Sequence, residues 1–485
     1  MIKLKLYNKL WIQIETENRE YLLAVKNYFS DFVDGYFHMP KYKAGVWDGK
    51  IYIFDWFNKC LPYGLLTDLI SFHKKYFSNL KLEISDDIKN LFNSKISNIE
   101  PEQCKLWNLR EYQDESVRKA IKYKKGILRI CTSGGKTLII YSIISTLQKL
   151  NEISNSIIIV PSTGLIMQFK QDMIDYGMDE KNIGVAYSKK KEWDKKVVIS
   201  TWQTLAKNKD QLNLYDCVVV DECHSSKAKI LSDILQKSNA KYRIGCTGTL
   251  PESQIDLWNI KSYLGPQLID IPASKLIEEN FISSIEVMMY NLYYKKEFIY
   301  NGITDVSVTV KYNDIKNQIF NNEYRKQFIF NLINNAKSTI LVLVGKVETE
   351  GDIIKNYLLE SNLYNEDSVI FINGKMDATE RENWRQKFIK NPDKKYIIIA
   401  TYGVFQAGVS IPNLSYLIFA APFASKIRIL QSIGRCLRKC VGKNGAIIYD
   451  LVDFNNKYCP KYADTRLRFY DQEKFPVTEK DFKEK

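Results

Sequence analysis

One short segment combines residue types that handle phosphate groups. The sequence RICTSGGKT at residues 129–137 ends in Gly135, Lys136 and Thr137, the close of a G-x-x-x-x-G-K-[ST] phosphate-binding loop. The chain has Ile130 where the first glycine of that loop is expected. In such a loop Lys136 reaches the β- and γ-phosphates, and Thr137 holds Mg²⁺ through its hydroxyl. The alternative is a chance GKT in a helix cap.

The flanking residues favour the phosphate loop. GILRI before it has the composition of a buried strand, and KTLIIYSIISTLQKL after it has the apolar spacing of a helix. The loop therefore leaves a strand and opens a helix, where backbone N–H groups and the helix dipole favour an anion. We predict that Ile130 ends the strand and that Gly134 and Gly135 let the backbone approach a phosphate closely.

A second segment places two acids at the end of an apolar strand. In CVVVDECH, residues 217–224, Asp221 is suited to bind Mg²⁺ through water, and Glu222 to polarise the attacking water. His224 lies directly beyond them, where it can couple this site to its neighbours. The alternative for His224 is an exposed loop residue.

A third segment, QSIGRCLRK, supplies cations. A helix beginning near Gln431 places Arg435 and Arg438 on one face, where two guanidinium groups can stabilise charge on a γ-phosphate. The alternative is a solvated basic helix. The first interpretation predicts that ATP binds between two domains, one carrying the loop and the other the arginines.

The elements that must position these residues form a repeated pattern. Short β-branched runs alternate with helical segments from about residue 106, lose the pattern between about 268 and 320, and then resume. Such runs are typical of parallel sheets covered on both faces, so we expect two α/β units in tandem. The predicted divisions are a small α+β domain (1–105), a first α/β domain (106–268), an irregular linker (269–312), a second α/β domain (313–455) and a tail (456–485).

Composition limits the class of protein to which this chain can belong. The net charge is +14, which serves either solubility or a polyanionic partner such as nucleic acid. The nine cysteines include no CxxC pair, which argues against a zinc ribbon and favours a reducing compartment. We expect neither a signal peptide nor a membrane span, and therefore a cytoplasmic location.

Taken in order, the segments resemble the motifs of superfamily 2 helicases. That resemblance implies two RecA-like domains and assigns a role to each motif. The matches are EYQ at 111–113 (the adenine-reading motif), TSGGKT at 132–137 (motif I), VPSTGLIMQ at 160–168 (Ia), STWQTL at 200–205 (Ib), DECH (II), TGT at 247–249 (III), ATYGVFQAGVSIP at 400–412 (V) and QSIGRCLR at 431–438 (VI).

The resemblance also implies site residues. The nucleotide is expected at Tyr112, Gln113, Thr132, Ser133, Gly134, Gly135, Lys136, Thr137 and Gly408; catalysis at Lys136, Asp221, Glu222, His224, Gln431, Arg435 and Arg438; and a DNA strand near Thr163, Thr201, Gln203, Lys346 and Thr401. Two departures stand out. Ser410 replaces the acid that many of these motors carry in motif V, and Gly248 replaces the commoner alanine of motif III.

The residues of these motifs are similar to those of the UvsW-type phage helicases. The similarity extends to two segments near the amino terminus, DGYFHMPKYKAGVWDGKIYIFD and LPYGLL. This resemblance covers nearly the whole chain. It implies an ATP- and Mg²⁺-dependent DNA helicase that unwinds branched DNA in recombination, repair and replication, with RNA in R-loops as a further substrate of some members. It implies the host cytoplasm if the source is viral, and no obligate protein partner.

The amino-terminal loop mixes rings with lysines. Lys41, Lys43 and Lys50 are expected to contact DNA phosphates, with plain solvation as the alternative. For Tyr36, Phe37, Tyr42 and Trp47 we expect a place in the core of the small domain, with base stacking as the alternative.

Two other classes share parts of this pattern. One is the motor subunit of an ATP-dependent nuclease or restriction system, which needs a further acid cluster that we do not find in 1–105 or 456–485. The other is a DNA-binding scaffold with a decayed ATPase. Intact Lys136, Glu222 and Arg435 argue against decay.

Overall fold

The computed structural model of this chain describes residues 1–92, 96–224, 228–302, 307–372, 376, 378–391, 394–402, 411, 414–440 and 443–485. Gly408 and Ser410 lie outside the described residues. The chain forms two compact units, one of Met1–Ile130 with Gly135–Ile271 and the other of Pro272–Lys485 with Cys131–Gly134.

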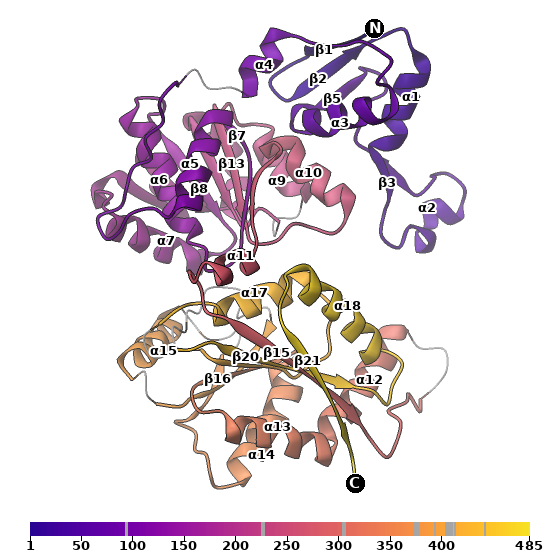
Figure 1. The fold of residues 1–485 in the computed structure, drawn as a ribbon, viewed down its shortest axis with the longest axis vertical. Helices are drawn as coiled ribbons and strands as arrows, with labels where there is room; N and C mark the ends of the chain where they lie inside the picture. Colours follow the sequence, from indigo (N-terminus) through magenta and orange to yellow (C-terminus); the bar gives the residue numbers. More distant parts are fainter. Residues whose placement is uncertain are drawn as a thin grey trace. The chain divides into compact units, whose positions relative to one another are not determined.

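The first unit begins with a small α+β domain, as predicted (Figure 1). Its sheet has the order β5-β2-β1-β6, with β1 antiparallel to β2 and parallel to β6. Alternation in β1 buries Ile2 and Leu4 and turns Lys3 and Lys5 outward. The elements are β1 (Ile2–Leu6), β2 (Trp11–Glu15), α1 (Arg19–Tyr28), β5 (Cys60–Pro62), η2 (Tyr63–Leu65), α3 (Leu66–Tyr76), β6 (Leu82–Ile84) and α4 (Asp86–Phe92).

A two-stranded arm is inserted into this domain. It consists of β3 (Ser30–Phe32) and β4 (Lys50–Tyr52), which pair antiparallel, with η1 (Tyr36–His38) and α2 (Pro40–Lys43) between them (Figure 1). We call residues 30–52 the arm.

The prediction that the rings of the arm join the domain core is wrong. Phe37 is 53% exposed and Tyr42 is 37% exposed, while Tyr36 and Trp47 are half-buried and absent from the domain's core cluster. The physical reason is that two strands of three residues form a single layer and have no second layer to bury their rings against. The rings pack on one another instead, with Tyr36 at 4.5 Å from Phe32 between centroids.

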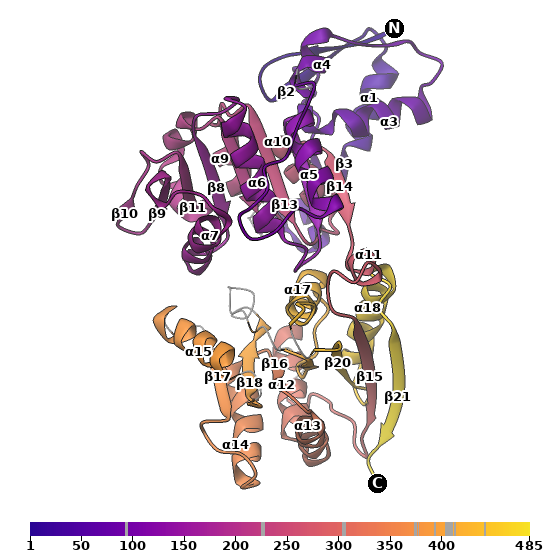
Figure 2. The same ribbon diagram turned by 60° about the vertical axis from the view of Figure 1, so that its left-hand side comes forward.

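The rest of the first unit is an α/β lobe, which we call lobe 1. Its sheet has the order β10-β9-β11-β8-β12-β13-β7-β14, parallel except for the short β10. Helices α5, α6 and α7 neighbour one another on one face, and α8, α9 and α10 on the other (Figure 2). The strands are β7 (Lys125–Ile130), β8 (Ser156–Val160), β9 (Ile183–Tyr187), β10 (Lys190–Lys191), β11 (Val197–Thr201), β12 (Cys217–Asp221), β13 (Tyr242–Thr247) and β14 (Gln267–Ile271).

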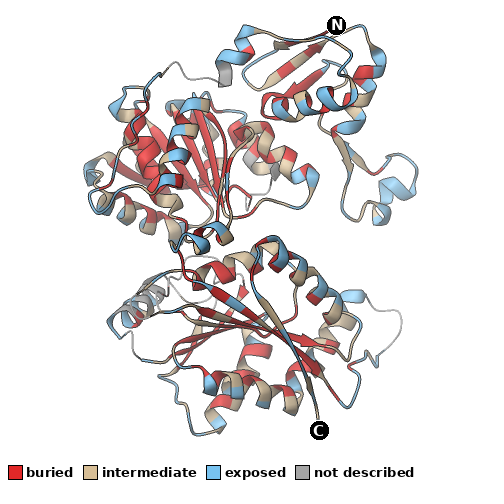
Figure 3. Ribbon diagram, in the orientation of Figure 1, coloured by how far each residue is buried: buried red, intermediate tan, exposed pale blue. Residues whose placement is uncertain are grey.

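The central strands of lobe 1 are buried along their whole length, shown in red in Figure 3. Continuous apolar runs such as SIIIV and CVVVD are the sequence form of strands covered by helices on both sides. The covering helices are α5 (Glu111–Tyr123), α6 (Lys136–Lys149), α7 (Thr163–Tyr176), α8 (Trp202–Ala206), α9 (Ala228–Leu235) and α10 (Gln254–Leu264), with the short η3 (Glu180–Asn182) and η4 (Lys209–Leu214).

The second unit contains a sheet of order β17-β18-β16-β19-β20-β15-β21, parallel throughout. We call it lobe 2. Its strands are β15 (Ile285–Tyr293), β16 (Ile340–Val344), β17 (Val369–Ile372), β18 (Ile397–Thr401), β19 (Tyr416–Phe419), β20 (Ala446–Asp453) and β21 (Val477–Lys483). Its helical elements are α11 (Ala273–Glu278), α12 (Val308–Asn321), α13 (Glu323–Asn335), η5 (Val347–Gly351), α14 (Asp352–Glu360), α15 (Ala378–Lys390), α17 (Lys426–Cys436) and α18 (Cys459–Gln472). Two parallel-sheet lobes confirm the predicted fold class.

Two intervals are more regular than their sequence pattern predicts. Within 269–312, β15 is a full strand of lobe 2, and within 456–485, β21 pairs with it as the edge strand. The edge strand VTEKDFK is largely polar, because a strand at the rim of a sheet keeps one side toward solvent. That composition concealed β21 from a search for apolar runs.

Candidate active site

The predicted phosphate loop lies between β7 and α6. The strand ends at Ile130, as predicted, and the helix begins at Lys136. Ser133 has a φ of 69° and Gly135 a φ of 76°, so the chain makes a left-handed turn before it enters the helix. The left-handed φ favours glycine at 135, and a Cβ added there would stand 2.5 Å from Nε2 of Gln113.

Three neighbouring strands end together at this loop. In the sheet, β13 lies between β12 and β7, and all three run parallel. Asp221 therefore closes one strand and Thr247 the next, beside the strand that ends at Ile130. The carboxyl edge of a parallel sheet is where α/β proteins bind ligands.

Side chains of these strand ends contact one another directly. Lys136 Nζ lies 3.0 Å from Glu222 Oε1, and the other oxygen of Glu222 lies 3.3 Å from His224 Nδ1. Glu222 has a φ of 47°, so the chain turns sharply after Asp221 to direct this carboxylate at the loop. The structure thus brings together the predicted lysine, glutamate and histidine.

Thr247 extends this cluster to the third strand. His224 Nδ1 and Thr247 Oγ1 are 2.5 Å apart, and the Thr247 hydroxyl donates to the carbonyl of Thr249 at 2.6 Å. Because that hydroxyl proton is already used, Nδ1 is the donor toward Thr247. Sequence reasoning did not include Thr247 among the site residues, although its place at the start of TGT, on the strand beside DECH, was the available signal.

Burial shifts the pKa of each acid–base group in the cluster. Burial, and then the adjacent Glu222 charge, raise the pKa of Asp221 to about 7. Burial alone would also raise the pKa of Glu222, but the charges of Lys136 and His224 lower it overall. Burial lowers the pKa of His224, against the opposing effect of Glu222. The neighbouring Lys136 and His224 thus favour the charged form of Glu222, whereas burial and Glu222 disfavour the charged form of Asp221.

The buried carboxylate of Asp221 fits a divalent cation. Its Oδ1 is buried and has no hydrogen-bond partner within the described part of the chain. A buried carboxylate oxygen without a donor is costly unless a cation or water serves it. Thr137 lies in the first turn of α6, directly after Lys136. No cluster of three or more His, Cys, Asp or Glu side chains that could hold a metal occurs in the described ranges.

The adenine-reading segment lies at the start of α5. Gln113 is buried, and its Oε1 accepts a hydrogen bond from the backbone N–H of Arg110 at 3.0 Å. That bond orients the amide so that Nε2 lies against Gly135. Tyr112 is also buried, and Arg110 Nη1 donates to its hydroxyl at 3.4 Å. Arg110 is a positioning residue that the sequence reasoning missed.

The helix that carries the predicted arginines differs from the sequence expectation. α17 begins at Lys426, well before Gln431, and ends at Cys436. Arg435 lies in its last turn, but Arg438 lies beyond the helix, so the two do not share a helical face. Leu437 caps the helix, and Ser283 of the chain before β15 donates to the carbonyls of Leu437 and Arg438. These bonds end the helix early.

The residues predicted near a DNA strand follow carboxyl ends of strands. Thr163 and Gln203 are exposed after β8 and β11, Lys346 is exposed after β16, and Thr401 is the last residue of β18. Thr201 differs, because its side chain is buried and its hydroxyl caps α8 through Thr204.

The arm carries the other predicted DNA contacts. Lys41 and Lys43 are exposed, whereas Lys50 is half-buried with its ammonium 4.8 Å from the ring centroid of Phe32. In the described part of the chain no helix is long and apolar enough to cross a membrane.

Models of three protein families match the chain. Residues 1–84 match "DNA helicase UvsW, N-terminal", residues 106–252 match "Type III restriction enzyme, res subunit", and residues 324–440 match "Helicase conserved C-terminal domain". The three matches follow one another as the small domain, lobe 1 and lobe 2 do.

Individual proteins are also similar. The "ATP-dependent DNA helicase uvsW" of Enterobacteria phage T4 is 29% identical over 96% of this chain and 93% of its own length. The "DNA 3'-5' translocase XPB2" of Sulfurisphaera tokodaii is 24% identical over 79% of this chain and 89% of its own. The crystal structure of T4 UvsW aligns with a TM-score of 0.50 and 25% identity, covering 99% of both chains.

A fragment of a putative HsdR subunit of a type I restriction enzyme from Vibrio vulnificus aligns with a TM-score of 0.57 at 15% identity, over 76% of this chain and 67% of that one. At that identity the likeness concerns the fold alone.

Proposed function

We infer the activity from one premise: this chain belongs to the superfamily 2 helicases, within their UvsW-type branch. It is an ATP-dependent DNA helicase that unwinds or remodels branched DNA in recombination, repair and replication. The observation that carries the hydrolytic part is the contact of Lys136, Glu222 and His224 where β7, β12 and β13 end side by side.

Lys136 and Glu222 have complementary tasks in hydrolysis. With no phosphate bound, each neutralises the other at 3.0 Å. A bound triphosphate competes for the lysine, because its β- and γ-phosphates concentrate more negative charge than one carboxylate. Glu222 is then released to orient a water molecule and accept its proton. His224, fixed by Thr247, keeps the carboxylate in place as it changes partners.

Mg²⁺ is proposed at Asp221 and Thr137. The cation fits the buried Oδ1 of Asp221, which otherwise has no hydrogen-bond partner in the described residues. When bound, Mg²⁺ neutralises charge on the phosphate oxygens. Gln113, held by Arg110, and Tyr112 are proposed for the adenine side of the same nucleotide.

Arg435 is proposed as the residue of lobe 2 that stabilises negative charge on the reacting phosphate, with Gln431 and Arg438 beside it in sequence. Its place in the last turn of α17 supports this role, because Leu437 and the bonds from Ser283 fix the backbone around it. Gly408 keeps its proposed role in the nucleotide site.

DNA is the proposed substrate, contacted by residues at or just after the carboxyl ends of strands. Thr163, Gln203, Lys346 and Thr401 follow carboxyl ends of parallel strands, where a motor can contact a backbone of any sequence. Thr201 is proposed to act through its backbone and its cap, since its side chain is buried. RNA in R-loops is a further proposed substrate.

An unwinding panel tests the activity. The protein is mixed with ATP, Mg²⁺ and labelled substrates: a fork, a four-way junction, an R-loop and a plain duplex. We expect strand separation on the branched substrates, more slowly on plain duplex, and none with Lys136→Ala. Absence of ATP-dependent separation on every substrate contradicts the proposal. Cut strands in place of separated ones would instead support the restriction-type motor.

The arm lysines give a quantitative prediction for DNA binding. Replacing Lys41 and Lys43 by alanine removes two exposed cations, so the slope of log affinity against log salt for duplex DNA should become shallower by about 2. The measurement is a binding titration at several salt concentrations. Lys74→Ala with Lys81→Ala, two exposed lysines of the same domain outside the arm, is the matched control. Equal slopes for the two pairs would remove the arm from the DNA site.

A further inference from the structure

Helix α10 begins close to the nucleotide edge. It follows the TGT segment, in which Thr247 accepts the hydrogen bond of His224, and Ser253 caps its first turn by accepting from Asp256 N–H. Its carboxyl end packs behind the same edge. A Cβ at Gly245 of β13 would stand 2.7 Å from Leu264 Cδ1 and 3.1 Å from Cys223 Sγ, so helix, strand and the residue after Glu222 are in close contact.

The other side of α10 is embedded in the small domain. Trp258 is a member of that domain's core cluster, with its ring 5.5 Å from Phe29 between centroids. Lys261 Nζ lies 2.9 Å from Asp68 Oδ1 on α3. In the same stretch the Tyr63 hydroxyl donates to the carbonyl of Tyr263 at 2.7 Å. One helix of lobe 1 therefore supplies an apolar, an ionic and a hydrogen-bonded contact.

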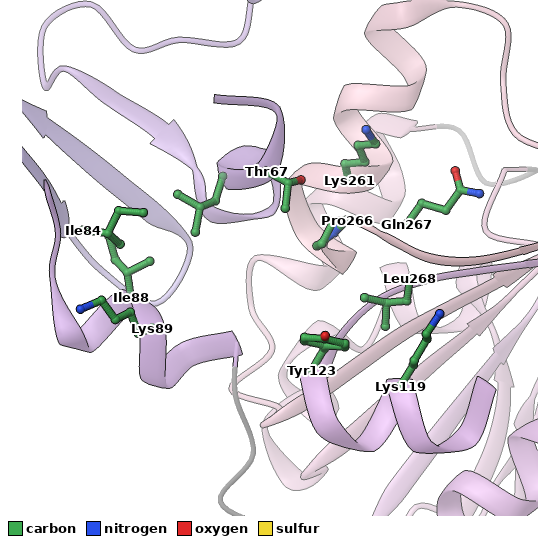
Figure 4. Close-up of a pocket in the computed structure, with 11 residues that line it drawn as sticks. Thr67, Ile84, Ile88, Lys89, Lys119, Tyr123, Lys261, Pro266, Gln267 and Leu268 are labelled. Carbon is green, nitrogen blue, oxygen red and sulfur yellow. The ribbon is translucent and has the colours of Figure 1, made fainter. Parts of the chain in front are cut away.

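The backbones meet at this point. A Cβ at Gly64 of η2 would overlap the carbonyl oxygen of Lys261, which leaves room only for glycine. Beside the contact the small domain and lobe 1 diverge around a cleft of about 590 Å³ (Figure 4). Ile84 and Ile88 line the side of the small domain, and Tyr123 and Leu268 line that of lobe 1. The close contact with α10 thus lies directly beside this cleft.

We propose that α10 couples the nucleotide site to the small domain, and that Asp68 and Lys261 are positioning residues for this coupling. A shift of TGT as Glu222 exchanges Lys136 for a water molecule moves the start of α10, and the helix carries η2 and α3 with it. DNA held by the small domain is then displaced with each hydrolytic cycle. By reciprocity, DNA bound there changes the affinity for nucleotide. The inference rests on the proposed function.

The test removes the ionic contact and leaves the chemistry intact. In Asp68→Asn the lysine of α10 loses its carboxylate partner, while every residue of the nucleotide site is unchanged. We expect the number of forks unwound per ATP hydrolysed to fall roughly fivefold, with DNA-stimulated ATP turnover changed less than about twofold. Asp86→Asn is the matched control, because Asp86 pairs with Lys89 inside α4 and does not contact α10.

Two further measurements separate coupling from a loss of folding. The exchanged pair, Asp68→Lys with Lys261→Asp, should recover most of the unwinding yield. Amide hydrogen exchange across residues 63–68 should slow when a non-hydrolysable ATP analogue binds the wild type, and should respond less in Asp68→Asn. Such a response is not expected of a contact that only stabilises the fold.

The outcomes distinguish this inference from the proposed function. Wild-type protein that unwinds forks, with Asp68→Asn giving the same yield per ATP and the same exchange response, overturns the coupling and leaves the helicase activity standing. Wild-type protein that hydrolyses no ATP and unwinds nothing overturns both. A fall in yield for Asp86→Asn equal to that for Asp68→Asn also overturns the coupling, since it would show a general effect of removing an acid.

Discussion

The two ends of strands β7 and β13 both carry buried charges, but of different character. At the carboxyl end, Lys136 pairs with Glu222, and His224 joins Glu222 to Thr247. Every one of these groups has a partner of opposite or complementary type, and the orphan Oδ1 of Asp221 adds a place for a cation. We propose that this end exchanges partners when a nucleotide binds.

At the amino end the charges are of one sign. Lys125 and Arg243 face each other across the two strands, and neither forms an ion pair with an acid in the part of the chain that the structure describes. Lys125 is 5% exposed, and its ammonium nitrogen stands 4.4 Å from the ring centroid of Tyr63. Arg243 Nη2 donates to the carbonyl of Ser238 at 2.7 Å.

The amino and carboxyl ends of these strands thus differ in the groups that contact their charged side chains. The Tyr63 ring lies beside Lys125 and the Ser238 carbonyl accepts from Arg243, and Tyr63 also joins the small domain to lobe 1. Burial, and then the neighbouring charges of Arg243 and Lys124, lower the pKa of Lys125 to about 7. We therefore propose that the amino end serves attachment and stability and that the carboxyl end serves the chemistry.

The largest effect is expected from Glu222→Gln. The amide cannot accept the proton of the attacking water, so ATP turnover should fall by about 10²-fold or more while nucleotide binding persists. Turnover with forked DNA and equilibrium binding of a fluorescent ATP analogue measure the two quantities. Glu152→Gln, a glutamate of lobe 1 that pairs with Lys241, is the control. Full ATP turnover in Glu222→Gln would show that ATP is not hydrolysed at the carboxyl end of these strands.

A pH effect is expected from Lys125. Between about pH 7 and its unfolded pKa of about 10.4, the unfolded chain holds a proton on Lys125 that the folded chain lacks, so stability rises with pH. Relative to Lys125→Met, the free energy of unfolding of wild type should rise by up to about 1.4 kcal/mol per pH unit between pH 7.5 and 9.5. Chemical denaturation of both proteins across this range measures it.

A difference between wild type and Lys125→Met that does not change with pH would mean that the lysine stays charged when folded. The amino end would then contain a partner for it, and the contrast between the two ends would weaken.

The smallest effect is expected from Tyr63→Phe. The change keeps the ring under Lys125 but removes the hydroxyl that donates to Tyr263. We expect a loss of about 1 kcal/mol in the free energy of unfolding, with unchanged ATP turnover in the absence of DNA. Urea denaturation and a DNA-free ATPase assay measure these. A loss of ATP turnover in the absence of DNA would show that Tyr63 affects hydrolysis, and would contradict the separation of roles between the two ends of the strands.

The carboxyl end was predictable from sequence because each of its parts is local. A strand, glycines and GKT identify the phosphate loop, and an apolar strand followed by DECH identifies the acidic segment. Because parallel strands end at the same edge of a sheet, the two segments are expected to lie close together. The end of β7 at Ile130 followed from the same pattern.

The amino end was not predictable, because its contacts are made between distant segments. No residue near Lys125 in the sequence indicates a contact with Tyr63 or Arg243. The exposed rings of the arm were missed for a related reason, since ring-rich sequence indicates a core only where a second layer exists. The early end of α17 depends on Ser283, which lies far away in the chain.

The most direct test of the account compares two lysines of lobe 1. ATP turnover is measured with saturating forked DNA for Lys136→Ala, at the carboxyl end, and Lys125→Met, at the amino end. We expect Lys136→Ala to lose about 10²-fold or more in ATP turnover and Lys125→Met to stay within about twofold of wild type. Retained turnover in Lys136→Ala, or an equal loss in both variants, would contradict the assignment of the nucleotide to the carboxyl edge.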